Sequence, residues 1–261
     1  MSDDDDKKAP TKTATTAPKQ THVDKQAEEF LRKVKELGSA KAALEAITKP
    51  AGRIIFAMDA TSSREPTWEL ARNLQLDMFQ AAAGLEFQLV YFRGVNECRH
   101  SKWVSQPSAL EILMGRIGCV AGYTQIRKVL EHARDETAKR PVNALVYVGD
   151  SFEENIDLVI PRAREAGMPV FVFQEKSAHS SGGRIQSLKA GDDEPTETEK
   201  AFRAIAKASG GAYFLFDEGS ADQLRQLLEA VAVYATQGTA GLEAQAQVSV
   251  PARLLLTQIK K

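Results

Sequence analysis

The residues best suited to chemistry follow a short apolar stretch early in the chain. Asp59, Thr61 and Ser63 stand at alternate positions directly after the run Arg53-Ile-Ile-Phe-Ala-Met58. In an irregular loop at the end of a buried strand, three such side chains can converge on one small, hard cation. Because oxygen is their only donor atom, the pattern favours magnesium or manganese and argues against zinc.

A second acid ends another apolar run in the same way. Asp150 follows Asn143-Ala-Leu-Val-Tyr-Val-Gly149, and a loop that ends at Thr124 offers a further hydroxyl just before a helical pattern. If the two runs are neighbouring parallel strands at the point where a doubly wound sheet reverses its order, their loops diverge and open a crevice. Asp59 and Asp150 would then face each other across it, and Thr124 can reach the same place.

Short apolar strands separated by helical patterns are expected to position these loops. Strands are predicted at 53–58, 87–92, 97–104, 143–149, 169–174 and 212–216, and helices at 65–83, 108–116, 124–138, 156–166, 197–208 and 221–235. The third strand is more polar and follows a short turn, which is typical of an antiparallel edge. We therefore predict an α/β fold: a doubly wound, mostly parallel six-stranded sheet of order 3-2-1-4-5-6, with strand 3 antiparallel at the edge and helices on both faces.

Four parts of the chain differ in composition. Residues 1–22 are almost free of apolar side chains and are expected to be disordered, and their Asp-Asp-Asp-Asp-Lys run also resembles an enteropeptidase cleavage tag. We predict an N-terminal helical pair at residues 23–50 and the main domain at residues 51–236. Residues 237–261 are predicted to form a tail with a short amphipathic segment. The connection at 175–197 is long and fits either a lid or a disordered insertion.

Composition and charge exclude several classes of function. The chain has 34 Lys and Arg against 35 Asp and Glu, so neither a nucleic acid nor an anionic membrane is expected as a partner. The sequence shows no apolar run of about 18 residues and no signal-peptide core, so we expect a cytoplasmic protein. Cys98 and Cys119 lack metal-site spacing and are interpreted as two small buried or half-buried thiols.

The residues that follow the predicted strands do not match common enzyme motifs. A phosphatase of the haloacid dehalogenase class would need an Asp two residues after Asp59, where Thr61 stands. Neither a P-loop lysine motif nor a GxGxxG turn follows a predicted strand, and the four His residues lie on unrelated segments. Ser62 and Glu65 have the spacing of a capping box. A structural alternative is therefore that the hydroxyls here cap a helix and bind no metal.

The three polar segments resemble the metal-ion-dependent adhesion site (MIDAS) of the von Willebrand factor A (vWA) family. That site combines an Asp-x-Ser-x-Ser loop after strand one, a Thr from a later loop and an Asp after strand four. Here Asp59, Thr61 and Ser63 match the first loop, with a Thr in place of its first Ser. Thr124 matches the later Thr and Asp150 the last acid. All five are the metal ligands that the resemblance implies.

The resemblance extends from Arg53 to Ala235 and is greatest to the stand-alone, cytoplasmic bacterial members. It implies a protein-binding module without enzymatic activity. A Mg²⁺ ion, or Mn²⁺ or Ca²⁺ in its place, stays coordinatively open when neutral hydroxyls hold it, and an Asp or Glu carboxylate of a protein partner is its natural last ligand. Cytoplasmic relatives often work beside AAA+ ATPases or chaperone-like assemblies, so such a partner is expected. Two alternatives remain: a metal-dependent phosphohydrolase on a similar sheet, and a scaffold whose metal site is vestigial.

Overall fold

The computed structural model describes most of the chain from residue 52 onward. The described residues are 52–67, 84–176 and 195–259, with Arg32, Lys35 and Gly38. The chain divides into a first unit, Met1–Lys49, and a compact second unit, Pro50–Lys261. The three described residues of the first unit are helical. The predicted tail at 1–22, the rest of the pair at 23–50 and most of the 175–197 connection lie outside the described residues.

Six strands of the second unit form one sheet with the order β3-β2-β1-β4-β5-β6. The strands are β1 (Gly52–Asp59), β2 (Leu85–Arg93), β3 (Glu97–His100), β4 (Ala144–Gly149), β5 (Val170–Glu175) and β6 (Ala212–Phe216). Neighbouring strands are parallel except β2 and β3, which are antiparallel. The predicted α/β fold, its strand order and its antiparallel edge are therefore confirmed. The edge strand is shorter than predicted: after His100, Ser101 donates its N–H to the Leu89 carbonyl at 2.8 Å, and Val104 pairs with Phe87 of β2 as an isolated bridge.

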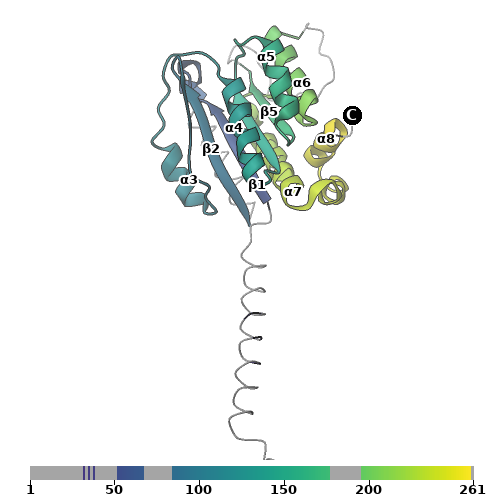
Figure 1. The fold of residues 1–261 in the computed structure, drawn as a ribbon. Helices are drawn as coiled ribbons and strands as arrows, with labels where there is room; N and C mark the ends of the chain where they lie inside the picture. Colours follow the sequence, from purple (N-terminus) through teal and green to yellow (C-terminus); the bar gives the residue numbers. More distant parts are fainter. Residues whose placement is uncertain are drawn as a thin grey trace, which may run out of the picture. The chain divides into compact units, whose positions relative to one another are not determined.

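Helices cover both faces of this sheet (Figure 1). One face carries α4 (Ile126–Lys139), α5 (Ile156–Glu165) and α6 (Glu197–Ser209). The other carries α3 (Pro107–Met114), α7 (Ala221–Ala246) and α8 (Val250–Ile259). Two short 3₁₀ helices, η1 (Ser62–Thr67) and η2 (Glu218–Ser220), follow β1 and β6. The helix predicted to start at residue 65 thus begins, in its described part, as a 3₁₀ turn.

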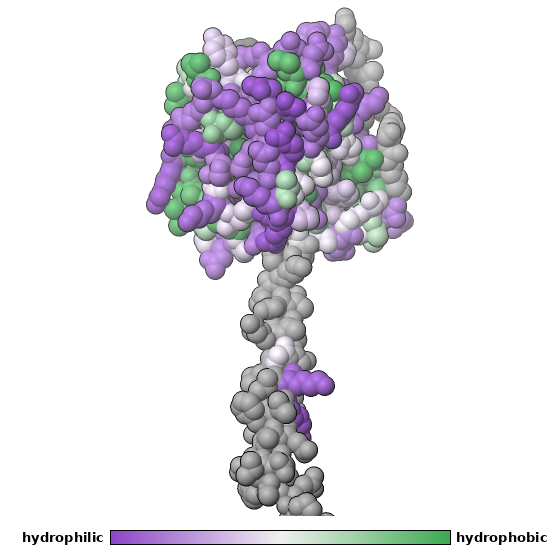
Figure 2. All heavy atoms as spheres, in the orientation of Figure 1, coloured by the Kyte–Doolittle hydropathy of each residue, from purple (hydrophilic) through white to green (hydrophobic). Residues whose placement is uncertain are grey.

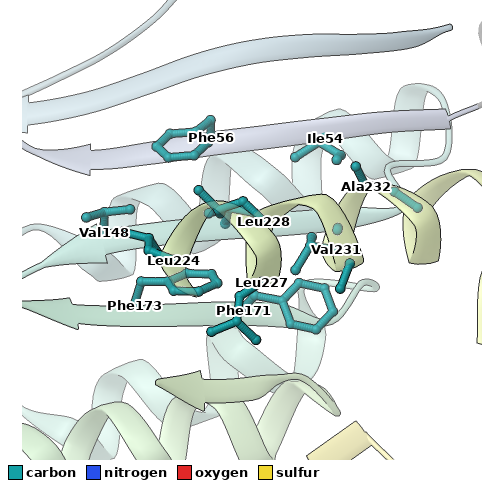
Figure 3. Packing of buried hydrophobic residues seen from close by; sticks show 14 of the residues in the cluster. Ile54, Phe56, Val148, Phe171, Phe173, Leu224, Leu227, Leu228, Val231 and Ala232 are labelled. Atoms are coloured by element: carbon teal, nitrogen blue, oxygen red, sulfur yellow. The ribbon is translucent and has the colours of Figure 1, made fainter. Parts of the chain in front are cut away.

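Alternating side chains of the buried strands supply the two layers of the core. On β1, Ile54 and Phe56 point toward α7, while Ile55 and Ala57 belong to the layer under α4. Figure 3 shows how leucines of α7, such as Leu228, pack against the sheet face that β1, β4 and β5 form. Burial of each such side chain stabilises the fold by about 1.5–3 kcal/mol. The strands that end at the candidate site are thus held from both faces.

The chain after residue 236, for which the sequence predicts a tail with an amphipathic segment that docks either on the domain or on a second copy, is helical. α7 continues to Ala246, with a break at Gly238, whose φ of 67° and ψ of −160° are not helical. Leu242 on α7 and Leu255 on α8 are both fully buried in the core. The amphipathic segment therefore packs on the domain itself, because these apolar side chains continue its hydrophobic layer.

Two observations concern the surface of the described residues. Within these residues, no helix combines the length and the apolar composition that crossing a membrane requires. In the view of Figure 2, hydrophilic side chains cover most of the described surface, and hydrophobic ones form separate small patches. Exposed apolar residues are therefore informative where several of them gather at one place.

Candidate metal centre

β1 delivers the first group of predicted ligands to the loop at its carboxyl end. Asp59 is the last residue of the strand and is 0% exposed. Its Oδ1 accepts hydrogen bonds from the Thr61 backbone N at 2.8 Å and from Thr61 Oγ1 at 2.6 Å. The same Oγ1 lies 3.2 Å from the Oγ of Ser63, which is exposed. The alternate side chains therefore form one hydrogen-bonded chain that leads from the core to solvent.

β4 delivers the second acid beside the first, because it is the neighbour of β1 in the sheet. Asp150 follows this strand, and its negative charge contributes to a raised pKa of Asp59. Thr124 is tied to the Asp150 loop, since its Oγ1 accepts the backbone N–H of Glu153 at 3.0 Å. In the described part of the chain, no hydrogen bond joins Thr124 directly to Asp59, so contacts of the neighbouring loops must set the distance between Thr124 and Asp59.

Two carboxylate oxygens of this cluster are buried without a hydrogen-bond partner. They are Oδ2 of Asp59 and Oδ1 of Asp150. Burial raises the pKa of Asp59 to about 6, against the opposing effect of the two hydrogen bonds from Thr61. A buried, unpaired anionic oxygen is costly, and a cation is the usual group that offsets the cost. The donor set of two carboxylates and three hydroxyls therefore fits a small, oxygen-preferring metal ion.

An ion pair that the sequence did not predict lies at the same place. Arg64 of η1 is 1% exposed and pairs with Glu175 at the end of β5. Burial lowers the pKa of Arg64, while the negative charges of Asp150 and Asp59 act in the opposite direction. The guanidinium therefore supplies positive charge beside both candidate carboxylates. Glu175 ends a buried strand as Asp59 does, and the same rule applied to β5 would have identified it.

Tyr147 of β4 interacts electrostatically with both candidate carboxylates, and Gly149 of the same strand lies next to its hydroxyl. The Tyr147 hydroxyl is buried without a hydrogen-bond partner, and burial raises its pKa, with Asp59 and Asp150 acting in the same direction. A Cβ atom on Gly149 would lie 2.4 Å from that hydroxyl oxygen, so only glycine leaves it room. The hydroxyl therefore stays protonated at neutral pH.

The loop before Thr124 is held against two other loops. Val120 donates its N–H to the Ala60 carbonyl at 3.0 Å, and Tyr123 donates to the Gly94 carbonyl at 3.2 Å. A Cβ atom on Gly122 would lie 2.0 Å from that same Gly94 oxygen, so the close approach of the two loops requires glycine. These contacts fix the start of α4 and with it the position of the Thr124 hydroxyl.

Comparisons with known proteins support the fold. No family model and no curated protein matches this chain. Among solved structures, a von Willebrand factor type A protein from Catenulispora acidiphila matches with a TM-score of 0.54 and 16% identity, over 69% of this chain and 42% of that one. BatB from Bacteroides thetaiotaomicron (TM-score 0.52, 18% identity) and an aerotolerance-related membrane protein from Bacteroides fragilis (0.53, 16%) match over 69% of this chain and 98% of their own. The compact unit of this chain therefore has the fold seen in von Willebrand factor A domains.

Proposed function

We propose that this domain binds a protein partner through a Mg²⁺ ion held at the carboxyl edge of the sheet. The ligands are Asp59, Thr61, Ser63, Thr124 and Asp150, and an Asp or Glu side chain of the partner completes the coordination. The observation that carries the proposal is the presence of two buried carboxylate oxygens without a hydrogen-bond partner, one on Asp59 and one on Asp150. A bound cation offsets the cost of burying them.

The charges at the site favour a carboxylate as the incoming ligand. Two carboxylates balance a divalent cation, the three hydroxyls add no charge, and Arg64 is balanced by Glu175. The loaded site therefore carries no excess negative charge that would repel a second protein's carboxylate. Ser63 is exposed, so the hydroxyl end of the ligand chain is open to solvent. This is where a partner can approach.

The chain's own residues prepare the site before any ligand arrives. Oδ1 of Asp59 is engaged by Thr61, which leaves Oδ2 for a metal. The Glu153 backbone N–H holds the Thr124 hydroxyl so that its remaining lone pair is available. A bound Mg²⁺ ion supplies the positive charge that attracts the partner's carboxylate. Ligands fixed in this way lose little conformational freedom on binding, which strengthens a site with few charges.

A scaffold that binds partners without metal is the second candidate function, and Arg64 is the observation that favours it. The buried guanidinium already compensates part of the negative charge of Asp59 and Asp150, and it repels a second cation. In such a scaffold the partner binds at another surface. Replacement of Asp59 would then leave partner binding unchanged, whereas the metal-dependent function predicts its loss.

Calorimetric titration of MgCl₂ and MnCl₂ into the protein tests the proposed site. We expect one saturable site in the wild type, tighter in the presence of acetate as a stand-in for the partner's carboxylate, and no binding in Asp59→Ala. Ser62→Ala is the matched control, because Ser62 is exposed and is not a proposed ligand. Thermal unfolding of each variant in a chelator distinguishes a lost metal site from a misfolded domain.

The outcomes separate the alternatives. Absence of metal binding by the folded wild type, with and without acetate, would contradict the metal-dependent function and leave the scaffold. Hydrolysis of p-nitrophenyl phosphate by the metal-loaded protein, lost in Asp59→Ala, would instead establish the phosphohydrolase. We expect no such turnover, since Thr61 stands where a phosphatase of the haloacid dehalogenase class needs its second Asp.

A further inference from the structure

Exposed apolar side chains gather on one side of the candidate metal centre. Val95, in the turn between β2 and β3, is 76% exposed, and Val120 and Tyr123, in the loop before α4, are 45% and 61% exposed. We call these three residues the apolar rim. Tyr123 directly precedes the proposed ligand Thr124. A protein segment that reaches the metal would therefore meet the apolar rim as well.

Backbone hydrogen bonds hold the loops that carry the apolar rim. Gly94 donates its N–H to the Val120 carbonyl at 3.4 Å and accepts from the Tyr123 N–H at 3.2 Å, so two strand-end loops are joined. Val120 is in turn bonded to Ala60, which lies between Asp59 and Thr61. Side chains on so fixed a backbone lose little freedom when a partner covers them. The apolar rim thus has the properties of a contact surface continuous with the metal centre.

A pocket of different chemistry lies on the α5 and α6 side of the same centre. Its volume is about 390 Å³, and it is lined by Phe152, Glu153, Glu154, Ile156, Glu197, Lys200 and Ala201. Glu153 joins it to the metal centre, because its backbone N–H binds the Thr124 hydroxyl and its carboxylate accepts the Thr124 N–H at 3.3 Å. We call this space the acidic pocket.

The charge of the acidic pocket favours a cationic side chain. Its lining contains three carboxylates and one ammonium group, which is a formal charge of −2. Lys200 pairs with Glu197 at 2.9 Å. Glu153 and Glu154 accept hydrogen bonds from the uncharged backbone N–H groups of Thr124, Ile126 and Arg127. Phe152 and Ile156 add an apolar wall, and a Lys or Arg can lay its methylene stem on such a wall while its charged end reaches the acids.

We propose that the partner segment carries three adjacent features: the acidic residue that completes the metal centre, a Lys or Arg that enters the acidic pocket, and a large apolar residue that packs on the apolar rim. This inference rests on the proposed function, because the acidic residue anchors the segment. Charge complementarity with the acidic pocket favours the basic residue, and burial of apolar area on the apolar rim favours the large apolar residue. The acidic pocket and the apolar rim would thus determine which acidic segments this domain binds.

Display of two peptide libraries tests the inference. One library has a fixed Asp with three random residues on each side, and the other has Asn in place of the Asp. Both are selected on the folded wild-type domain in MgCl₂ and again in a chelator. We expect enrichment of the Asp library only, in MgCl₂ only. Among the selected peptides, Lys or Arg near the Asp and a large apolar residue on its other side should each exceed their starting frequency by about fivefold.

Variants of the domain assign each preference to its surface. Glu197→Lys brings the formal charge of the acidic pocket from −2 to 0, because one acid becomes a base, and it should abolish the preference for Lys or Arg. Tyr123→Ser should abolish the preference for a large apolar residue. Asp135→Lys on α4 and Val248→Ser in the turn after α7 are matched surface controls, 59% and 89% exposed, and should change neither preference.

The possible results are distinguishable. Selection of Asp peptides with random neighbours would overturn this inference and leave the proposed function standing. Loss of the basic preference in Asp135→Lys as readily as in Glu197→Lys would also overturn it, since a general charge effect would then explain the result. Equal enrichment of the Asn library, or enrichment of neither library, would overturn the proposed function and this inference with it.

Discussion

Replacement of Asp59 by Asn separates the contribution of this residue to stability from its proposed role in metal binding. Asn keeps an Oδ1 atom that can accept the two hydrogen bonds from Thr61. It removes the charge of a carboxylate whose Oδ2 is buried without a partner. We therefore expect Asp59→Asn to stabilise the metal-free domain while it abolishes Mg²⁺ binding, because an amide is a much weaker ligand for a hard cation than a carboxylate.

The magnitude follows from the raised pKa of Asp59. Its folded-state pKa is about 6, against a usual value of 3.8. Since the pKa is raised, ionisation of Asp59 destabilises the folded state: the cost is absent well below pH 3.8, grows between pH 3.8 and 6, and is complete above pH 6. A pKa difference of about 2 corresponds to about 3 kcal/mol. For a domain of this size, that is a rise in Tm of roughly 6–12 °C.

Thermal unfolding in a chelator, at pH 8 and at pH 4, measures this effect. The stabilisation of Asp59→Asn relative to the wild type should approach its full value at pH 8 and fall below about 1 kcal/mol at pH 4, where Asp59 is protonated in the folded wild type. Asp135→Asn serves as the control, because Asp135 is 59% exposed and its replacement should change the free energy of unfolding by less than about 0.5 kcal/mol at either pH.

Two results would refute this reasoning. A variant less stable than the wild type at pH 8 would mean that the Asp59 carboxylate is already compensated in the metal-free domain, with Arg64 as the evident source of the compensation. A stabilisation equal at pH 8 and pH 4 would mean that the effect does not arise from ionisation. In the wild type, added Mg²⁺ should raise Tm, and it should leave the Tm of Asp59→Asn unchanged.

Three further predictions concern the described fold. Arg64→Gln removes the buried ion pair with Glu175 and should lower the free energy of unfolding by about 3–5 kcal/mol in a urea titration. A loss below about 1 kcal/mol would contradict the burial of this ion pair. Gln258→Ala removes two hydrogen bonds that the side-chain amide makes with the backbone N–H and C=O of Tyr213. It should lower the free energy of unfolding by about 1–3 kcal/mol and speed hydrogen exchange of the Tyr213 amide. An exchange rate equal to that of the wild type would contradict this prediction. Leu228→Ala should cost about 2–5 kcal/mol by chemical denaturation, against less than about 0.5 kcal/mol for the exposed Leu158→Ala, and equal costs would refute the packing of α7.

The order of the strands was predictable from sequence because it depends on local patterns. Apolar runs of strand length, each followed by a helical pattern, define parallel neighbours, and the one polar strand after a short turn must lie at an edge. Asp59 and Asp150 each end such a run. Their proximity then follows from the topology alone, since β1 and β4 are neighbours. The structure places Asp59, Thr61 and Ser63 in one hydrogen-bonded chain for the same local reason.

Contacts between distant side chains were not predictable in this way. Arg64 and Glu175 belong to segments on opposite sides of β4 in the chain order. Glu175 ends a buried strand, but no local pattern marks Arg64 as its buried partner. His100 on β3 and His132 on α4 are far apart in the sequence, yet their rings stack with centroids 4.3 Å apart. The continuation of α7 past Gly238 was missed because glycine and polar residues there resemble a helix end.

Under the proposed function, the buried Arg64 links folding, metal binding and partner binding in this domain. In a site made only of acids and hydroxyls, loss of the metal leaves buried negative charge, and folding then depends on the metal. Here the guanidinium remains beside Asp59 and Asp150 and is itself paired with Glu175, so the charges are partly compensated without a metal. A divalent cation that enters this cluster is attracted by its three carboxylates and repelled by Arg64, and a carboxylate from the partner reduces that repulsion. Under the proposed function, metal and partner therefore bind cooperatively, and by thermodynamic linkage each raises the other's affinity by the same factor.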